Sequence, residues 1–237
     1  LIAPHAGHSY SGPVAGSAFA AVRGMMPDLV AVISPMHQPY QHALLTTGHQ
    51  AYSTPLGDIH VDKDALQNLN EILRRELGQG LEPVRNDTEH SLEIELPFLQ
   101  AALAGEFKLL PVMMRDQSRH IARILGKALA KTLQGVNALL VGSTDLSHFY
   151  SQREANSLDR EMLKHLEAFD PDAIIQAEVE GKGFACGRGA MAAVLWAAMD
   201  LGADDVKILD YATSGDITGN YSRVVGYGSA AIIRSAK

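Results

Sequence analysis

Apolar runs of strand length alternate with segments of helical periodicity along most of the chain. Short, continuous apolar runs are typical of strands that are covered on both faces, as in parallel sheets lying between helices. The final two runs are separated by only a short glycine-containing stretch, so we expect them to pair as an antiparallel hairpin. The predicted strands cover residues 1–3, 29–34, 43–47, 107–113, 138–143, 206–211 and 224–233.

Between these runs, apolar residues recur at intervals of three and four, which predicts amphipathic helices. Pro97 is expected to bend or split the second of them. Asp170 followed by Pro171 is typical of a helix start. The last helix is the most apolar, so we expect it to pack against the sheet. The predicted helices cover residues 62–77, 91–104, 117–133, 153–169, a segment beginning at 170, and 187–201.

This alternation predicts an α/β fold with a central mixed, mostly parallel β-sheet covered by helices on both faces. The 237 residues contain no internal repeat and no low-complexity linker, and this length can bury one full core. We therefore expect a single domain over residues 1–237. Because the chain begins with Leu1 inside a predicted strand, we also expect a short natural segment to precede it.

Composition excludes several classes of protein. Hydrophobic residues make up 46% of the chain and charged residues 20%, which is typical of globular proteins. The net charge of -7 argues against a nucleic-acid partner, and no apolar run is long enough to span a membrane. A single cysteine rules out an internal disulfide and favours a reducing, cytoplasmic location. Alanine and methionine positions that look exposed, as in "AFAAVRGMM", would tolerate an interface, so a homo-oligomer is possible.

Three of the predicted strands end in loops that carry polar side chains. His5 follows the first strand, His37 follows the second, and Asp145 and His148 follow the strand at 138–143. In open α/β sheets, ligands bind beyond the carboxyl ends of the strands. If these strands are parallel, their loops share one edge of the sheet, which predicts one site there. Each histidine taken alone is more often a loop residue that forms an ordinary hydrogen bond.

Asp145 and His148 stand three residues apart in "TDLSH". A carboxylate beside an imidazole fixes its tautomer and raises its basicity, which suits a general base. We therefore predict that His148 is a catalytic residue and that Asp145 orients it. The alternative is a local turn in which the Asp145 side chain bonds to the backbone.

The stretch "NDTEHSLEIELPF" places His90 and Glu93 three apart near a predicted helix start. They are candidates to contact the metal ligands or the catalytic residues without binding the metal themselves. Acidic residues are also favoured early in helices by the helix dipole, which explains Glu89 and Glu93 without any site. Among the remaining histidines, His8 and His60 are the strongest candidates to reach the site, and His8 is taken as a supporting residue.

Cys186 lies at the start of the most apolar helix, next to Arg188. A helix N-terminus and a neighbouring cation both lower the pKa of a thiol, and a thiolate is a soft metal ligand. The alternative is a small, buried apolar side chain. The nearby "GRGAMA" matches a dinucleotide fingerprint, but no convincing strand precedes it, so nucleotide binding is not expected.

Six motifs occur in a characteristic order: "APHAGHSYSG", "SPMHQP", "YSTPLGD", "EHSLEIELPF", "STDLSH" and "CGRGA". Together they resemble the Memo family, whose bacterial members are also called AmmeMemoRadiSam system protein B. The resemblance covers nearly the whole chain. It implies a fold shared with the class III extradiol dioxygenases, which are non-haem iron enzymes with the metal at the carboxyl edge of the sheet.

Carried over motif by motif, the resemblance implies that His5, His37 and Cys186 are the metal ligands. The dioxygenases have a carboxylate in the third ligand position, where Memo-like proteins have cysteine. His148 falls where the dioxygenases keep a catalytic histidine, with Asp145 close by. Fe(II) is the metal expected first, and copper and zinc remain open. The sequence departs from the common pattern at His8, where an aromatic residue is usual, and at Gly189.

The resemblance therefore implies a metal-binding, dioxygenase-like oxidoreductase acting on an unidentified small molecule. A shared fold does not fix the reaction. One alternative is a non-catalytic module that binds a peptide or protein in the same pocket. Another is a zinc-dependent hydrolase, in which the metal activates water.

Overall fold

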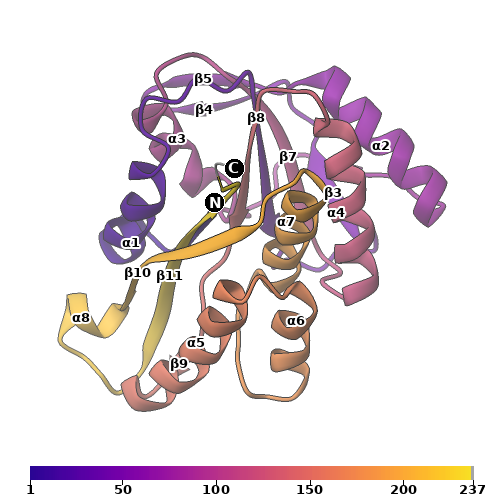
Figure 1. Cartoon of the computed structure of the whole chain (residues 1–237). Coiled ribbons are helices and arrows are strands. Elements are labelled where there is room, and N and C mark those ends of the chain that lie inside the picture. The colour runs from indigo at the N-terminus through magenta and orange to yellow at the C-terminus, as the bar shows by residue number, and fades with distance from the viewer. Residues whose placement is uncertain (236–237) are drawn as a thin grey trace.

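The computed structural model describes residues 1–235, and its centre is a nine-stranded mixed sheet (Figure 1). The strand order is β10-β11-β1-β8-β2-β7-β3-β6, and β9 pairs with β11 outside this path. A separate two-stranded sheet is formed by β4 and β5. The strands are β1 (Ile2–Ala3), β2 (Leu29–Pro35), β3 (Leu44–Thr47), β4 (Ala51–Thr54), β5 (Gly57–His60), β6 (Glu82–Val84), β7 (Lys108–Met114), β8 (Ala138–Ser143), β9 (His148–Tyr150), β10 (Asp205–Thr213) and β11 (Val224–Ile233).

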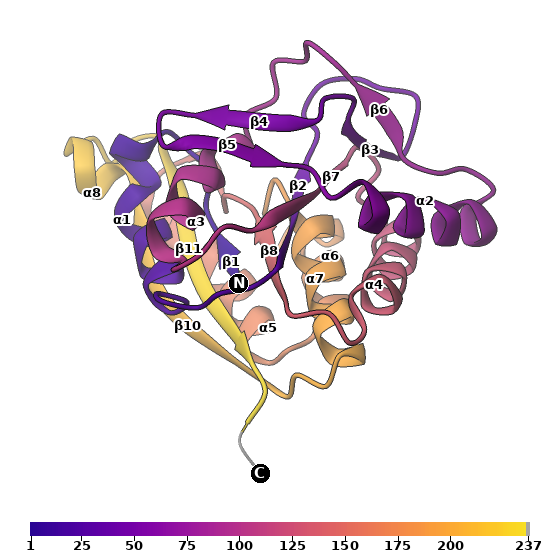
Figure 2. The same ribbon diagram turned by 90° about the horizontal axis from the view of Figure 1, so that it is seen from above.

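Helices cover both faces of this sheet (Figure 2). One core lies between the sheet and α2, α4, α5, α6 and α7. The other lies beneath α1, α3 and the small β4–β5 sheet. The helices are α1 (His8–Ala20), α2 (Lys63–Leu77), α3 (Leu96–Ala102), α4 (Arg119–Leu133), α5 (Gln152–Glu167), α6 (Pro171–Val179), α7 (Arg188–Asp200) and α8 (Ser214–Thr218).

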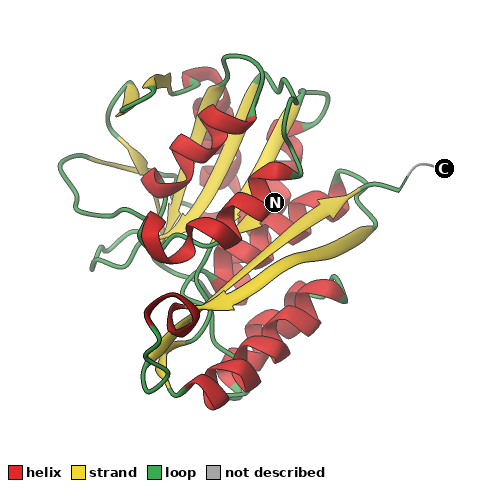
Figure 3. Ribbon diagram, turned by 90° about the vertical axis from the view of Figure 1, so that its left-hand side faces the viewer, coloured by secondary structure: helices red, strands yellow, loops and turns green. Residues whose placement is uncertain are grey.

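The predicted fold class is confirmed. Strands β1, β8, β2 and β7 are parallel to their neighbours in this series, whereas β11 pairs with β1, and β3 with β7, in antiparallel fashion. The expected hairpin of the last two strands is also found. It is a long antiparallel pair, β10–β11, that runs alongside α5 (Figure 3). Residues 236 and 237 of the predicted domain lie outside the described residues.

Several elements differ from those predicted. Residues 8–20 form a helix although Pro13 lies inside it, because the packing of Val14, Ala18 and Phe19 against the sheet outweighs weak local propensity. The helix expected from residue 91 begins with a 3₁₀ turn at Glu93–Glu95 and becomes α-helical at Leu96. Pro97 therefore lies in the first turn of α3, where a proline is tolerated, and does not bend it.

The most apolar helix, α7, packs on the sheet and against α4, as its composition predicted. Its residues from Gly189 to Ala198 are buried. The approach to α4 is close at Gly126, where an added Cβ atom would lie 2.8 Å from the Ala193 carbonyl oxygen and 2.8 Å from Cβ of Trp196. Within residues 1–235, no helix is both long and apolar enough to cross a bilayer.

Replacing Gly126 with alanine should therefore destabilise the protein by about 1–3 kcal/mol, because α4 and α7 must move apart. The matched control is Gly16→Ala in α1, where an added Cβ atom meets nothing within 4 Å. That change should be neutral or stabilise by up to about 1 kcal/mol through helix propensity. Chemical denaturation of both variants measures the difference, and equal stabilities would contradict the close packing.

Candidate metal centre

The parallel pairing of β1, β8 and β2 delivers three loops to one edge of the sheet. Ala3 is paired with Ser143, and Gly142 is paired with Ile33 on the other side. The strands therefore end side by side, and their carboxyl ends lead directly into the loops that carry His5, Asp145 and His37. The predicted convergence of these loops is found.

His5, His37 and Cys186 form a compact cluster of potential ligands. One ligand atom from each residue lies within 4.8 Å of the other two. Cys186 Sγ is 3.2 Å from His5 Nε2, and the two imidazole centroids are 5.7 Å apart. His5 is buried, Cys186 is half-buried and His37 is exposed. The cluster can hold a metal ion and opens to solvent on the side of His37.

His5 is fixed from behind by the end of β8. Its Nδ1 lies 2.8 Å from the Ser143 hydroxyl oxygen, which leaves Nε2 facing the cysteine. Burial, together with the nearby His37 and His90, lowers the pKa of His5 to about 3. The ring is therefore neutral, with one unshared nitrogen lone pair, as a metal-ligating imidazole requires.

His37 is fixed by a residue for which the sequence suggested no role in the site, Glu89. One carboxylate oxygen accepts hydrogen bonds from the His37 backbone N–H at 2.6 Å and ring Nδ1 at 3.0 Å. The other accepts from the backbone N–H groups of His90 at 2.9 Å and Ser91 at 3.0 Å. Burial opposes the charge of Glu89, but these four bonds hold its pKa well below the usual range. In turn, the bond to Glu89 raises the pKa of His37.

Cys186 and Asp145 join two loops through their backbones. The Cys186 N–H donates to the Asp145 carbonyl at 3.1 Å, and the Asp145 N–H donates to Cys186 Sγ at 3.2 Å. The Asp145 side chain accepts from the backbone N–H groups of His5 at 2.9 Å and Ala6 at 3.2 Å. Burial raises the pKa of Asp145 to about 6. Asp145 thus ties the His5 loop to the cysteine loop.

The expectation of a lowered thiol pKa is wrong for the metal-free chain. Burial, followed by the charge of Asp145, raises the pKa of Cys186. Arg188, expected to stabilise a thiolate, forms an ion pair with Glu178 instead. The sequence showed Arg188 and the helix start. It did not show the burial of the Cys186 sulfur or the pairing of Arg188 with Glu178.

Further contacts hold the turn that carries Cys186. The Gln117 side chain donates to the Cys186 carbonyl at 2.6 Å and accepts from the Gly189 N–H at 2.9 Å. Gly187 donates to the Thr144 hydroxyl at 2.8 Å. An added Cβ atom at Gly187 would lie 2.4 Å from the Ser143 carbonyl oxygen, so only glycine permits this approach.

His148 lies on β9, close enough to the cluster to affect the pKa of His5, but the partner that orients its ring is not the predicted Asp145. Its Nδ1 lies 2.8 Å from the Leu146 carbonyl oxygen, so the backbone and not the Asp145 side chain fixes the ring. The rings of Phe149 and Phe184 form T-shaped contacts with the imidazole, with centroid separations of 5.7 and 5.6 Å. Oδ1 of Asp145 is engaged by the His5 loop, and the charge of Asp145 also interacts with His148. The Nε2 atom of His148 is left for a ligand or substrate.

The remaining candidates divide into one neighbour of the cluster and three outlying residues. The His90 ring centroid lies 6.1 Å from that of His5 and 6.4 Å from that of His37. Glu93 instead lines a hollow of about 200 Å³ that also borders Glu89. His8 lies 3.1 Å from the Ile94 carbonyl oxygen, and His60 borders another hollow beside the β4–β5 hairpin. Glu93, His8 and His60 therefore do not join the ligand cluster.

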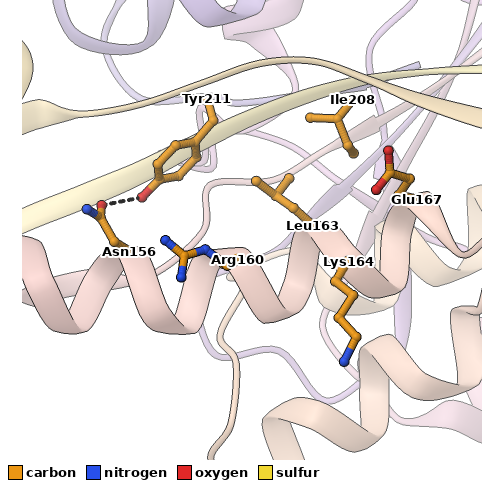
Figure 4. A pocket seen from close by; sticks show the side chains of 7 residues that line it. All are labelled: Asn156, Arg160, Leu163, Lys164, Glu167, Ile208 and Tyr211. Carbon is orange, nitrogen blue, oxygen red and sulfur yellow. Dashed lines mark hydrogen bonds between the residues drawn. The ribbon is translucent and has the colours of Figure 1, made fainter.

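A buried carboxylate braces the segment between Asp145 and His148. Asp159 on α5 accepts from the Ser147 N–H at 2.8 Å and from the Tyr211 hydroxyl at 2.8 Å. The same hydroxyl reaches Asn156 at 3.0 Å, at one end of a hollow of about 290 Å³ between α5 and β10 (Figure 4). None of the cluster residues lines this hollow, so it is separate from the site.

Comparison with known proteins identifies the relatives of this chain. The sequence model of a family described as "Memo-like protein" matches residues 1–231. The chain belongs to the Memo family. A "MEMO1 family protein" of Nitrosopumilus maritimus is 35% identical over 233 residues, which cover 98% of this chain and 84% of that protein. Similar proteins of Methanothermobacter thermautotrophicus and Thermotoga maritima are 36% and 34% identical, covering 96% and 97% of this chain and 82% and 81% of theirs.

Membership of the Memo family confirms the resemblance drawn from the six motifs. Three residues near the cluster were nevertheless missed as site residues: Glu89, which contacts His37, Ser143, which contacts His5, and Glu95, whose carboxyl oxygen lies 2.7 Å from the Ser143 hydroxyl. Glu89 stands directly before His90 in "EHSLEIE", and an acidic residue beside a histidine was the only local signal for it. Its contact with His37 spans 52 positions and required the fold.

Replacing Glu89 with glutamine should lower the pKa of His37 in the metal-free protein, because the hydrogen-bonded negative charge that raises it is removed. NMR titration of the His37 ring measures the change. The control is Glu76→Gln on the exposed surface of α2, which should leave the titration of His37 as it is in the wild type. An unchanged His37 pKa in the Glu89 variant would mean that the ion pair is absent in solution.

Proposed function

We propose that this Memo-family protein binds one redox-active metal ion through His5, His37 and Cys186 and acts as a non-haem, dioxygenase-like oxidoreductase on a small molecule. The observation that carries the proposal is the convergence of three ligand atoms within 4.8 Å at the carboxyl edge of the parallel strands. Ligands of α/β sheets bind at this edge.

The donor set fits a transition metal. Both imidazoles are anchored through Nδ1, His5 by Ser143 and His37 by Glu89, so each leaves Nε2 available. Such outer partners fix the ring orientation and increase ligand basicity. Two imidazoles and a sulfur favour iron, copper or zinc over the hard cations Mg²⁺ and Ca²⁺. Of these we propose Fe(II), with copper as the nearest alternative.

Cys186 must lose its proton when it becomes a ligand, since the thiolate is the form that binds metals. The Asp145 backbone N–H already points at Sγ from 3.2 Å and stabilises the resulting negative charge. The two loops are therefore arranged to accept a thiolate even though burial keeps the metal-free thiol protonated.

A non-haem iron centre with three protein ligands supplies open coordination positions for oxygen and substrate. His148 is the residue of this chain that would move a proton at the substrate. Its Nδ1 is held by the Leu146 carbonyl, which directs the tautomer and leaves Nε2 to accept or donate the proton. The rings of Phe149 and Phe184 pack against the imidazole.

The wild-type protein, purified without oxygen, should bind one equivalent of Fe(II). His5→Ala, His37→Ala and Cys186→Ser should each weaken binding about 100-fold or more, because each removes a ligand. Anaerobic titration calorimetry together with elemental analysis measures stoichiometry and affinity. The control His120→Ala removes an exposed histidine on α4 and should bind like the wild type.

The outcomes of this titration separate the candidate functions. A wild-type protein that takes up no iron, copper or zinc would contradict the proposal and favour a module that binds a peptide or protein. Tight binding of zinc, with hydrolysis and without oxygen consumption, would instead favour a zinc hydrolase.

His148→Ala should retain the metal but lower oxygen consumption by roughly 10²–10⁴-fold, the usual contribution of a general acid or base. The assay is an oxygen electrode with the iron-loaded protein and a panel of catechols. Equal rates for the variant and the wild type, on any substrate that supports consumption, would remove His148 from the reaction.

A further inference from the structure

Glu95 is fully buried behind His5, at the end of the 3₁₀ turn that leads into α3. It reaches His5 through one intermediate residue. Glu95 Oε1 lies 2.7 Å from the Ser143 hydroxyl oxygen, and that oxygen lies 2.8 Å from His5 Nδ1. The same hydroxyl oxygen lies 2.6 Å from the Ser91 carbonyl oxygen.

The Ser143 hydroxyl therefore has three close partners but only one hydrogen. It can donate once and accept twice. The Ser91 carbonyl has no hydrogen in any protonation state, so its contact of 2.6 Å requires the hydroxyl hydrogen. His5 Nδ1 and Glu95 Oε1 must then each bring a hydrogen to the Ser143 oxygen. A charged Glu95 would instead face that oxygen with no hydrogen between them.

We infer that Glu95 is a positioning residue of the metal centre: it holds its proton as a neutral acid and donates it to Ser143, which keeps His5 in the Nδ1–H tautomer with Nε2 facing Cys186. The effect of Glu95 on metal affinity rests on the proposed metal site. The hydrogen-bond arrangement itself belongs to the metal-free chain and is tested there.

The second oxygen of Glu95 supports the neutral form independently. Oε2 is buried and has no hydrogen-bond partner among residues 1–235. A neutral carbonyl tolerates such a position far better than a carboxylate, which requires several donors or a cation. Burial likewise raises the pKa of Glu95 to about 8.

Glu89 provides the contrast within the same site. Its two oxygens accept four hydrogen bonds, three of them from backbone N–H groups, so it remains charged although buried. Glu95 accepts none from a backbone N–H group of the described chain. One histidine of the cluster is thus backed by a charged carboxylate, and the other by a neutral acid acting through a serine.

Infrared difference spectroscopy of the metal-free protein at pH 6 tests the protonation of Glu95 directly. The wild type should show the carbonyl band of a protonated carboxylic acid that disappears in Glu95→Gln. The control Glu76→Gln, in which an exposed carboxylate is changed, should keep the band. Absence of a difference band between the wild type and Glu95→Gln would overturn the inference.

NMR of ¹⁵N-labelled histidine tests the positioning role. In the wild type, His5 should be the Nδ1–H tautomer with a slowly exchanging ring proton, and His5 as the Nε2–H tautomer would overturn the inference. Glu95→Gln keeps an N–H donor for Ser143 and should retain this signal. Glu95→Met and Ser143→Ala should lose it through exchange while the fold, followed by circular dichroism, is kept.

Metal affinity supplies the functional readout. Glu95→Gln should bind Fe(II) within about threefold of the wild type, and Glu95→Met should bind about tenfold or more weakly. Equal affinity in Glu95→Met and the wild type would overturn the positioning role. Failure of the wild type to bind any metal would contradict the proposed function alone, because the infrared and NMR measurements still decide the state of Glu95 and His5.

Discussion

The parallel register of β1, β8 and β2 is the constraint on which the site depends. Parallel neighbours end at the same edge, and the pairing of Ala3 with Ser143 and of Gly142 with Ile33 sets those ends level. Residues separated by more than a hundred positions along the chain are thereby brought into hydrogen-bonding distance. A slip of one residue would turn each side chain to the opposite face of the sheet and remove the cluster.

Burial then determines the chemistry of the side chains gathered there. It lowers the pKa of His5 and raises those of Asp145, Glu95 and Cys186. Glu89 escapes this trend only because it accepts four hydrogen bonds. The metal-free site therefore holds neutral His5 and a protonated thiol, and the charged Glu89 lies beside the exposed His37. A cation that binds here replaces the thiol proton and gains an anionic sulfur ligand. No further buried carboxyl group has to lose its proton for this to happen.

The sequence predicted those features that arise from local pattern. Apolar runs located the buried strands, and the polar residues that follow them located the edge where His5, His37 and Cys186 meet. It could not predict the contacts made across the fold. Glu89 and Ser143 interact with histidines 52 and 138 positions away, and neither has a spacing that reveals its partner. The predicted orienting partner of His148 was wrong for a related reason. Its ring is held by the Leu146 backbone carbonyl, and a contact with the backbone leaves no trace in side-chain patterns.

X-ray absorption spectroscopy of the iron-loaded protein, prepared without oxygen, tests the central claim most directly. The account predicts that the protein ligands seen around the metal are one sulfur and two imidazole groups. The sulfur contribution should disappear in Cys186→Ser. A bound metal with no sulfur neighbour in the wild type would contradict the assignment of Cys186, and with it the proposed centre.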